Sequence, residues 1–170
     1  MEYAIIFLPL IGSIASGFFG KNIGARNSQI LASSLVGISA ILSIYIFSQV
    51  LLESYSSNKI IFNWISSGNF YANWSVNIDP LSSIMLVVVT FISSIIHFYS
   101  IGYMNHDPHK IRFISYLSLF TFSMLTLVTS DNFLQLFFGW EGVGLCSYLL
   151  IGFWYTKPSA NAAAIKAFIV

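Results

Sequence analysis

The sequence has little charge. Of its 170 residues, 8% are Asp, Glu, Lys or Arg, whereas 56% are hydrophobic. Soluble domains carry about 25% charged residues, so this chain could not cover the surface of a water-soluble fold, and a soluble enzyme is excluded. The net charge of +1 gives no basis for binding nucleic acid. The composition instead predicts a protein whose solvent is the lipid bilayer.

Cysteine and a positively charged N-terminus are also lacking. Cys146 is the single cysteine, which excludes an internal disulfide and a Cys-rich metal site. The chain opens Met1-Glu2-Tyr3 without the basic residues of a secretory signal, so its first apolar segment is expected to be a retained helix. Histidines at 106 and 109 flank Pro108 in a loop with few other ligands. No metal site and no redox centre are predicted.

What the sequence has in abundance is long uncharged runs. A run of about 20 apolar residues crosses a bilayer as a helix. Five such runs occur, at residues 3–20, 27–52, 80–104, 113–130 and 132–155, and the fifth holds a single charge, Glu141. A sixth begins near Ser159 and stops at Val170, so we expect a partial sequence. The prediction is an all-α integral membrane protein, a polytopic bundle of five complete spans plus the start of a sixth, in one domain over residues 1–170.

The uncharged stretch from Ile60 to Ile78 has a different pattern. From residue 70 to 78, apolar residues alternate with polar ones, which is the period of a strand with one apolar face. Ser66-Ser-Gly-Asn69 is typical of a turn. We predict a β-hairpin over residues 60–78, between the second and third spans. It is expected on the membrane surface, because open sheet edges are not tolerated in hydrocarbon.

Basic residues are distributed unequally between the loops on the two sides of the membrane. Counted along the chain, loops one, three and five hold the residues Lys21, Arg26, Lys110, Arg112 and Lys157, and the other side holds Lys59. By the positive-inside rule, the odd-numbered loops face the cytoplasm or the matrix. The N-terminus and the hairpin then face the opposite side.

Glu141 is the most informative single residue. It lies well inside the fifth apolar run, where an ionised carboxylate costs several kcal/mol unless it is paired or hydrated. Intramembrane acids often belong to proton relays, and the neighbouring glycines at 139, 142 and 144 leave space for water or for close helix packing. The competing interpretation is a structural polar contact within the bundle.

Lys166 and His97 are further candidates for proton translocation. Lys166 lies about 7 residues into the sixth helix, and helix rise places it roughly 11 Å from the depth of Glu141. A direct pair is therefore not expected, and the alternative for Lys166 is that its side chain snorkels to the interface. His97, inside the third span, has a side chain suited to proton transfer, or it forms a hydrogen-bonded contact between helices.

The segment from Asp131 to Tyr155, with Gly139-Trp-Glu-Gly-Val-Gly144 at its centre, closely resembles the fifth helix of the antiporter-like subunit of complex I, called chain 5 or subunit L. Ala162-Ala-Ala-Ile-Lys166-Ala-Phe resembles the start of its sixth helix, and the segments beginning at Asp79 and His97 also fit. The resemblance covers essentially the whole chain.

This resemblance implies a proton-translocating membrane subunit of NADH:quinone oxidoreductase. Glu141 matches an essential acid of the family's proton channel, and Lys166 matches a lysine of the same polar region. The family implies no cofactor in this chain; NADH, FMN, iron–sulfur clusters and quinone belong to partner subunits. The expected partners are other complex I membrane subunits and the lipid bilayer. The family's pairing lysine lies on a later helix, so the chain alone is expected not to pump protons.

Two other functions stay open. A subunit of an Mrp-type cation/proton antiporter would carry the same helix and acid without an electron-transfer partner. A non-catalytic membrane scaffold would use Glu141 only for assembly. The expected location is the bacterial inner membrane as a multi-pass protein, or alternatively the mitochondrial inner membrane.

Overall fold

In the residues that the structure describes, the chain forms six helices and one two-stranded sheet. The computed structural model describes residues 1–53, 55–68 and 70–169. The helices are α1 (Glu2–Ile23), α2 (Ala25–Glu53), α3 (Pro80–Tyr103), α4 (Lys110–Val128), α5 (Phe133–Ile151) and α6 (Pro158–Ile169). The strands are β1 (Ser57–Ser67) and β2 (Phe70–Ile78). The predicted helical membrane fold with a hairpin between the second and third helices is confirmed.

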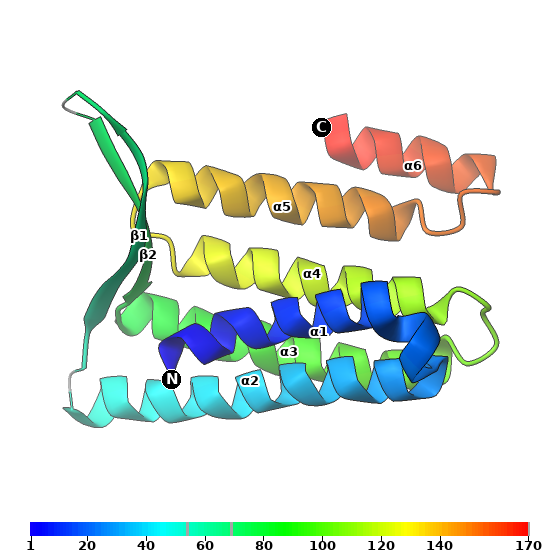
Figure 1. Cartoon of the computed structure of the whole chain (residues 1–170), viewed down its shortest axis with the longest axis horizontal. Coiled ribbons are helices and arrows are strands. Elements are labelled where there is room, and N and C mark those ends of the chain that lie inside the picture. Colours follow the sequence, from blue (N-terminus) through cyan, green and yellow to red (C-terminus); the bar gives the residue numbers. More distant parts are fainter. Residues whose placement is uncertain (54, 69, 170) are drawn as a thin grey trace.

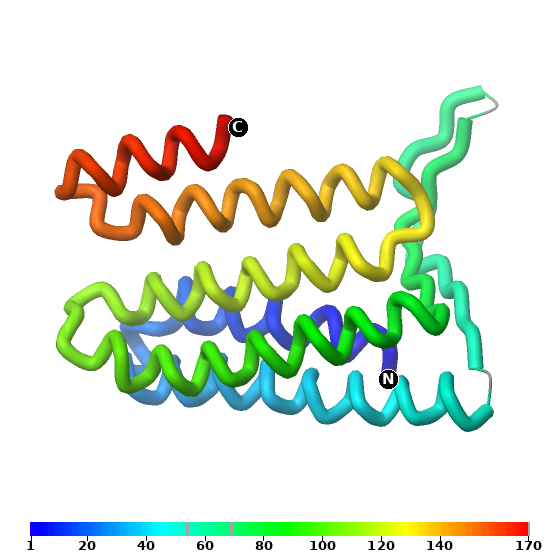
Figure 2. The backbone as a smooth tube through the Cα atoms, turned by 180° about the vertical axis from the view of Figure 1, so that it is seen from behind, coloured from blue at the N-terminus to red at the C-terminus, as the bar shows by residue number. Residues whose placement is uncertain are grey.

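The first four helices form a bundle, and the last two extend it sideways. Helices α1 and α3 each pack against both α2 and α4, so the four surround a common interior. Helix α5 packs on α4, and α6 packs on α5 at the edge of the molecule (Figure 1). Seen from behind, α3 lies in front of α1, with α2 and α4 on either side (Figure 2). The α5–α6 pair therefore forms a layer outside the four-helix interior.

Five of the helices, α1 to α5, have the length and apolar composition to cross a membrane. Their outward faces carry large apolar side chains, among them Phe18, Ile41, Phe91 and Phe98. Such a surface suits acyl chains and would aggregate in water. The chain is a multi-pass membrane protein. Helix α6 has 12 residues, fewer than the roughly 20 needed for one crossing.

The interior of the α1–α4 bundle is held by hydroxyl groups. Ser13 on α1 donates to the main-chain oxygen of Ser115 on α4, and Ser115 donates back to the oxygen of Ser13, both at 2.9 Å. Ser43 on α2 and Thr90 on α3 bring their hydroxyl oxygens to 2.7 Å. Small hydroxyl residues let helices approach closely and bond across the contact, which replaces the hydrophobic effect in lipid.

The hairpin lies across one end of the bundle (Figure 1). Its strands pair antiparallel, from Ser57 opposite Ile78 to Ser67 opposite Phe70. The hairpin predicted over 60–78 thus begins three residues earlier, at Ser57. Alternation could not identify this start, because Ser57-Asn-Lys59 is wholly polar and pairs only through its backbone with residues 76–78.

The apolar face of β2 turns toward the helices, as its alternation predicts, with Ala72, Val76 and Ile78 buried. A glutamine of α5 fixes this docking. Gln135 accepts the N–H of Ser75 at 3.0 Å and donates its amide to the Ser75 oxygen at 2.8 Å, as a neighbouring strand would. The hairpin is therefore anchored to the start of α5.

The sequence predicts two helix caps, Asp79 before Pro80 and Asp131 before Asn132, and their outcomes differ. Asp79 caps α3 as expected: its carboxylate accepts the N–H of Ser82 at 2.6 Å, and Pro80 takes the first helical position. The predicted cap by Asp131 on α5 is wrong. Asn132 is the cap and accepts the N–H of Gln135 at 2.9 Å, because a capping oxygen reaches the second or third N–H of its helix. Asp131 instead accepts from the Asn58 amide at 2.8 Å.

Candidate proton-carrying site

Glu141 lies in the middle of α5. It is the ninth residue of this 19-residue helix, roughly 12 Å from the first residue at 1.5 Å per residue. Both ends of α5 reach loops at opposite ends of the bundle (Figure 1). The carboxylate is therefore carried at mid-span depth, far from either interface.

The glycines around Glu141 show which face of α5 packs against α4 and which face is open. A Cβ atom added at Gly139 would lie 2.7–2.8 Å from Cβ, Cα and N of Leu127 on α4, and one at Gly142 would lie 2.8 Å from the Ser123 hydroxyl. One at Gly144 would meet nothing within 4 Å. The first two glycines thus make the close α4–α5 contact. Glu141, two positions after Gly139, points roughly 200° around the helix axis from it at 3.6 residues per turn.

The Glu141 side chain is consequently exposed on the α5–α6 layer. A hollow beside it is lined by Phe138, Leu145 and, from α6, Phe168. Among the described residues, no hydrogen bond or ion pair holds the Glu141 carboxylate; the single ion pair found there joins Lys59 to Glu2 at 3.2 Å. The acid is thus set against an apolar hollow without a counter-charge.

Lys166 also lies on the open side of this layer. It is exposed in the last turn of α6, a helix in which Ala164 is buried against its neighbours. Although α5 and α6 pack together, no ion pair within 4.0 Å joins Lys166 to Glu141 in the part of the chain that the structure describes. Neighbouring helices carry the two charges, and the side chains stay apart.

His97 occupies a different place, fully buried between α3 and α4. Its Nδ1 lies 2.7 Å from the main-chain oxygen of Ser93, which requires a proton on Nδ1. Its Nε2 lies 3.1 Å from the Ser118 hydroxyl on α4, which donates to it in the neutral ring. The Ser93 hydroxyl oxygen in turn lies 2.5 Å from the hydroxyl oxygen of Thr121 on α4. A neutral imidazole is completely satisfied by these bonds, so His97 forms a cross-link between two helices.

Within the described chain, the structure does not bring the three predicted site residues together. His97 lies inside the four-helix bundle, whereas Glu141 and Lys166 belong to the outer layer. A direct link from His97 to Glu141 would have to pass α4 and the glycine face of α5. Glu141 is the one member of the set at mid-membrane depth with an unsatisfied charge.

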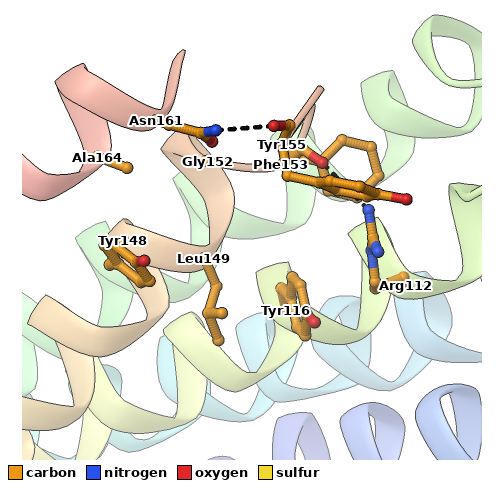
Figure 3. Close-up of a pocket in the computed structure, with 9 residues that line it drawn as sticks. All are labelled: Arg112, Tyr116, Tyr148, Leu149, Gly152, Phe153, Tyr155, Asn161 and Ala164. Carbon is orange, nitrogen blue, oxygen red and sulfur yellow. Dashed lines mark hydrogen bonds between the residues drawn. The ribbon is translucent and has the colours of Figure 1, made fainter. Parts of the chain in front are cut away.

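Sequence reasoning treated Arg112 only as a loop charge. The structure places it at a pocket of about 230 Å³ between α4, α5 and α6 (Figure 3). Its Nη2 donates to the Phe153 oxygen at 3.1 Å, and its guanidinium lies 4.8 Å from the Phe153 ring centroid and 5.6 Å from that of Tyr155. The aromatic run Phe153-Trp-Tyr155 after α5 is the sequence feature that could have predicted this contact, since arginine stacks on aromatic faces.

The loops beside this pocket are tied by Asp107. Trp154 Nε1 donates to one carboxylate oxygen at 3.0 Å, and the His109 N–H donates to the other at 2.7 Å. These hydrogen bonds, the Trp154 bond foremost, lower the pKa of Asp107 below its usual value. Within residues 1–53, 55–68 and 70–169, no three His, Cys, Asp or Glu residues come together in a group that could hold a metal ion.

Two protein-family models match parts of this chain. The family model described as NADH-ubiquinone oxidoreductase (complex I), chain 5 N-terminus, matches residues 64–114. A second, described as NADH:quinone oxidoreductase/Mrp antiporter, TM, matches residues 130–170, which include Glu141 and Lys166. The hairpin from residue 64 onward and α3 thus fall in the first match, and the α5–α6 layer falls in the second.

Individual relatives are similar along the whole chain. NADH-quinone oxidoreductase subunit L of Rickettsia felis is 56% identical over 165 residues, covering 97% of this chain and 26% of the relative. NADH-ubiquinone oxidoreductase chain 5 of Arabidopsis thaliana is 55% identical over 170 residues, covering 100% of this chain and 25% of the relative. The chain 5 protein of Phytophthora infestans is 54% identical over 166 residues.

The chain spans about a quarter of the length of these curated relatives. At this identity over nearly every residue, chance similarity is excluded. The chain belongs to the family of complex I membrane subunits that comprises NADH-quinone oxidoreductase subunit L and NADH-ubiquinone oxidoreductase chain 5.

Proposed function

We propose that this chain is part of a proton-translocating subunit of NADH:quinone oxidoreductase, and that Glu141 is the group on it that carries or controls the proton. The observation behind the proposal is the position of this acid: mid-span on α5, on the face turned away from α4, with no partner among the described residues. A carboxylate kept at this depth without a structural bond has the properties of a relay group.

An ionised Glu141 could not face acyl chains without a cost of several kcal/mol. The exposed face of the α5–α6 layer must therefore be covered in the assembled complex, by a cation or by groups that hold water. We propose that other complex I membrane segments cover it. A nearby cation favours the ionised form of a carboxylic acid, and its withdrawal favours proton uptake. Movement of that cation would then load and unload Glu141.

Lys166 and His97 have lesser parts in this proposal. Lys166, on the neighbouring helix and equally exposed, is placed to influence the charge near Glu141 through water. His97 could pass a proton only by breaking its bond to Ser118 or to the Ser93 oxygen. We therefore assign His97 first to holding α3 on α4, with proton transfer as its secondary role.

The chemistry that drives translocation belongs to partner subunits in this proposal. NADH, FMN, iron–sulfur clusters and quinone would be bound there, and the membrane segments described here would respond to quinone reduction at a distance. The membrane would be the bacterial inner membrane or its mitochondrial counterpart. The chain on its own would not pump protons, because the cover over Glu141 would be missing.

An Mrp-type antiporter subunit is the second candidate, since the model matching residues 130–170 is described for both kinds of protein. A structural scaffold is the third. All three can be separated by one substitution, Glu141→Gln, made in the assembled membrane complex that contains the chain. Glutamine keeps the shape of the side chain and removes its charge and its proton.

The measurement is NADH-driven acidification of inside-out membrane vesicles, with assembly followed by native gel. We expect Glu141→Gln to leave assembly intact and to reduce pumping by at least tenfold, while Glu53→Gln, at the exposed end of α2, leaves pumping unchanged. Loss of assembly would favour the scaffold. Normal NADH-driven pumping would contradict the relay, and sodium-coupled proton exchange without NADH would favour the antiporter.

A further inference from the structure

Charge is segregated between the two ends of the molecule. The loops at the end opposite the hairpin carry Lys21, Arg26, Lys110, Arg112 and Lys157, with Asp107 as their one acid. The hairpin end carries four acids, Glu2, Glu53, Asp79 and Asp131, with Lys59 as its one basic residue. Figure 1 shows that the loops of each set lie at a common end. One end of the bundle is therefore strongly positive.

At the hairpin end, opposite charges neutralise each other. Lys59 Nζ lies 3.2 Å from the buried Glu2 carboxylate, which also accepts from the hydroxyls of Tyr55 and Ser57. The ion pair raises the pKa of Lys59 above its usual value, with the hydrogen bond to Glu2 as the main cause. At the positive end, the Asp107 carboxylate is occupied by two N–H donors. No ion pair neutralises a basic side chain there among the described residues.

A groove between α1 and α4 opens at this positive end. Its polar rim is formed by Lys21, His109 and Arg112, and its apolar part by Phe18, Ile111 and Tyr116. Phe18 is 82% exposed, on a helix that crosses the membrane. The groove thus leads from a basic rim at the membrane boundary onto an apolar wall that faces acyl chains.

Arg112 has donors left over at this rim. Its Nη2 bonds the Phe153 oxygen, while its Nε is buried without a hydrogen-bond partner in the described part of the chain. Because the Nε is shielded, the rim depends on the rest of the guanidinium group, which forms an ion pair with no carboxylate among the described residues. Arginine favours phosphate as its partner. The N-terminus of α4, which begins at Lys110, adds partial positive charge at the same place.

We propose that this groove binds an anionic phospholipid, with the headgroup phosphate at Lys21, His109 and Arg112 and an acyl chain along Phe18 and Ile111. Basic pockets between membrane helices on the cytoplasmic or matrix side favour such headgroups. A free phosphate would use only the rim, whereas the apolar wall within the membrane fits a lipid. The site is separate from Glu141 and does not depend on the proposed proton chemistry.

Native mass spectrometry of the full chain in a neutral detergent tests the site. Phosphatidylglycerol or phosphatidylcholine of identical acyl chains is added, and the bound lipid is counted. We expect one phosphatidylglycerol to bind preferentially. Lys21→Gln and Arg112→Gln should each weaken it by roughly fivefold, the factor for one basic residue near an anionic lipid. Arg26→Gln, the control, removes a charge from the same end but not from the groove and should leave binding unchanged.

Two further measurements test whether the lipid binds specifically at this groove. Arg112→Lys retains the charge and should bind phosphatidylglycerol better than Arg112→Gln, which separates a binding role from damage to the fold. Excess inorganic phosphate should displace the lipid weakly or not at all. The proposal is overturned if the two lipids bind equally, if Arg26→Gln weakens binding as much as Lys21→Gln does, or if inorganic phosphate competes fully.

Discussion

The α1–α4 bundle and the α5–α6 layer handle polar groups in opposite ways. Ten residues of α2 are buried, against three of α5 and one of α6. In the bundle, His97 and all buried hydroxyls but that of Ser33 on α2 find partners on the same or the next helix among the described residues. In the layer, Glu141 and Lys166 are exposed and unpaired among the described residues.

This difference suggests that the α1–α4 bundle gives structural support, whereas the α5–α6 layer carries the ionisable groups. A Ser or Thr hydroxyl can bond a carbonyl one turn earlier, so it needs nothing further to lie in lipid. A carboxylate or an ammonium group has no such local solution and depends on a partner or on water. The bundle is therefore complete in itself, while the layer carries the groups whose charge can change.

The largest effect is expected at Gly139, where the bundle and the layer meet. Gly139→Ala places a Cβ atom 2.7–2.8 Å from main-chain and Cβ atoms of Leu127, and backbone atoms cannot move aside as a side-chain tip can. We expect a destabilisation of about 1–3 kcal/mol, typical of overpacking. The measurement is the midpoint of thermal unfolding in detergent.

Gly144→Ala is the matched control on the same helix. An added Cβ there meets nothing within 4 Å, and alanine favours helix over glycine by about 0.5–1 kcal/mol. The midpoint should stay the same or rise. Equal losses at both positions would mean that α5 does not lie against α4 through Gly139.

A smaller effect is expected inside the bundle. Thr90→Val keeps the shape of the side chain and removes the bond to Ser43, whose hydroxyl keeps its bond to the Ala40 oxygen at 2.8 Å. Hydrogen bonds between membrane helices are worth about 0.6 kcal/mol on average and up to about 1.7 kcal/mol. We expect a loss in this range, measured by equilibrium unfolding in mixed detergent.

Ser34→Ala provides the comparison for that loss. Ser34 is exposed and donates only to the Leu31 oxygen of its own helix, at 2.9 Å. Its removal should change stability by a few tenths of a kcal/mol at most, because surface substitutions away from special features have small effects. A loss as large as that of Thr90→Val would remove the distinction between bonds across helices and bonds within one.

Much of this fold could be predicted from the sequence. The uncharged runs located the spans because lipid tolerates few charges, and alternation located β2 because one face of it is buried. Two boundaries of elements in polar segments could not be predicted. Ser57 to Lys59 gave no alternation, and the cap of α5 depended on whether Asp131 or Asn132 reaches the Gln135 N–H, which neighbouring capping residues leave undecided.

The site was predictable only as a set of residues. Depth along a helix follows from sequence position, so Glu141 was placed correctly at mid-span. Direction around the helix depends on packing: Gly139 and Gly142 turn toward α4 and thereby turn Glu141 outward. The partners of His97 and the anchoring of Ser75 by Gln135 join positions 21 and 60 residues apart. No local pattern encodes such pairs.

The smallest expected effect concerns the loops that join bundle and layer at the positive end. The Asp107 carboxylate, between α3 and α4, accepts from Trp154 after α5, and its pKa is lowered chiefly by that bond. A lowered folded-state pKa stabilises the fold above the unfolded value of 3.8, and this contribution is lost as pH falls through the folded pKa.

Trp154→Phe should remove this pH-dependent stabilisation. The stability difference between wild type and Trp154→Phe, under about 1 kcal/mol because the pair is exposed, should therefore be present at neutral pH and disappear as the pH falls through the folded-state pKa of Asp107. Unfolding midpoints across this range measure it, with Trp140→Phe, an exposed tryptophan of α5, as control. A difference that does not change with pH would mean that the ring packs there without its hydrogen bond, and that the two regions are joined at this end by apolar contact alone.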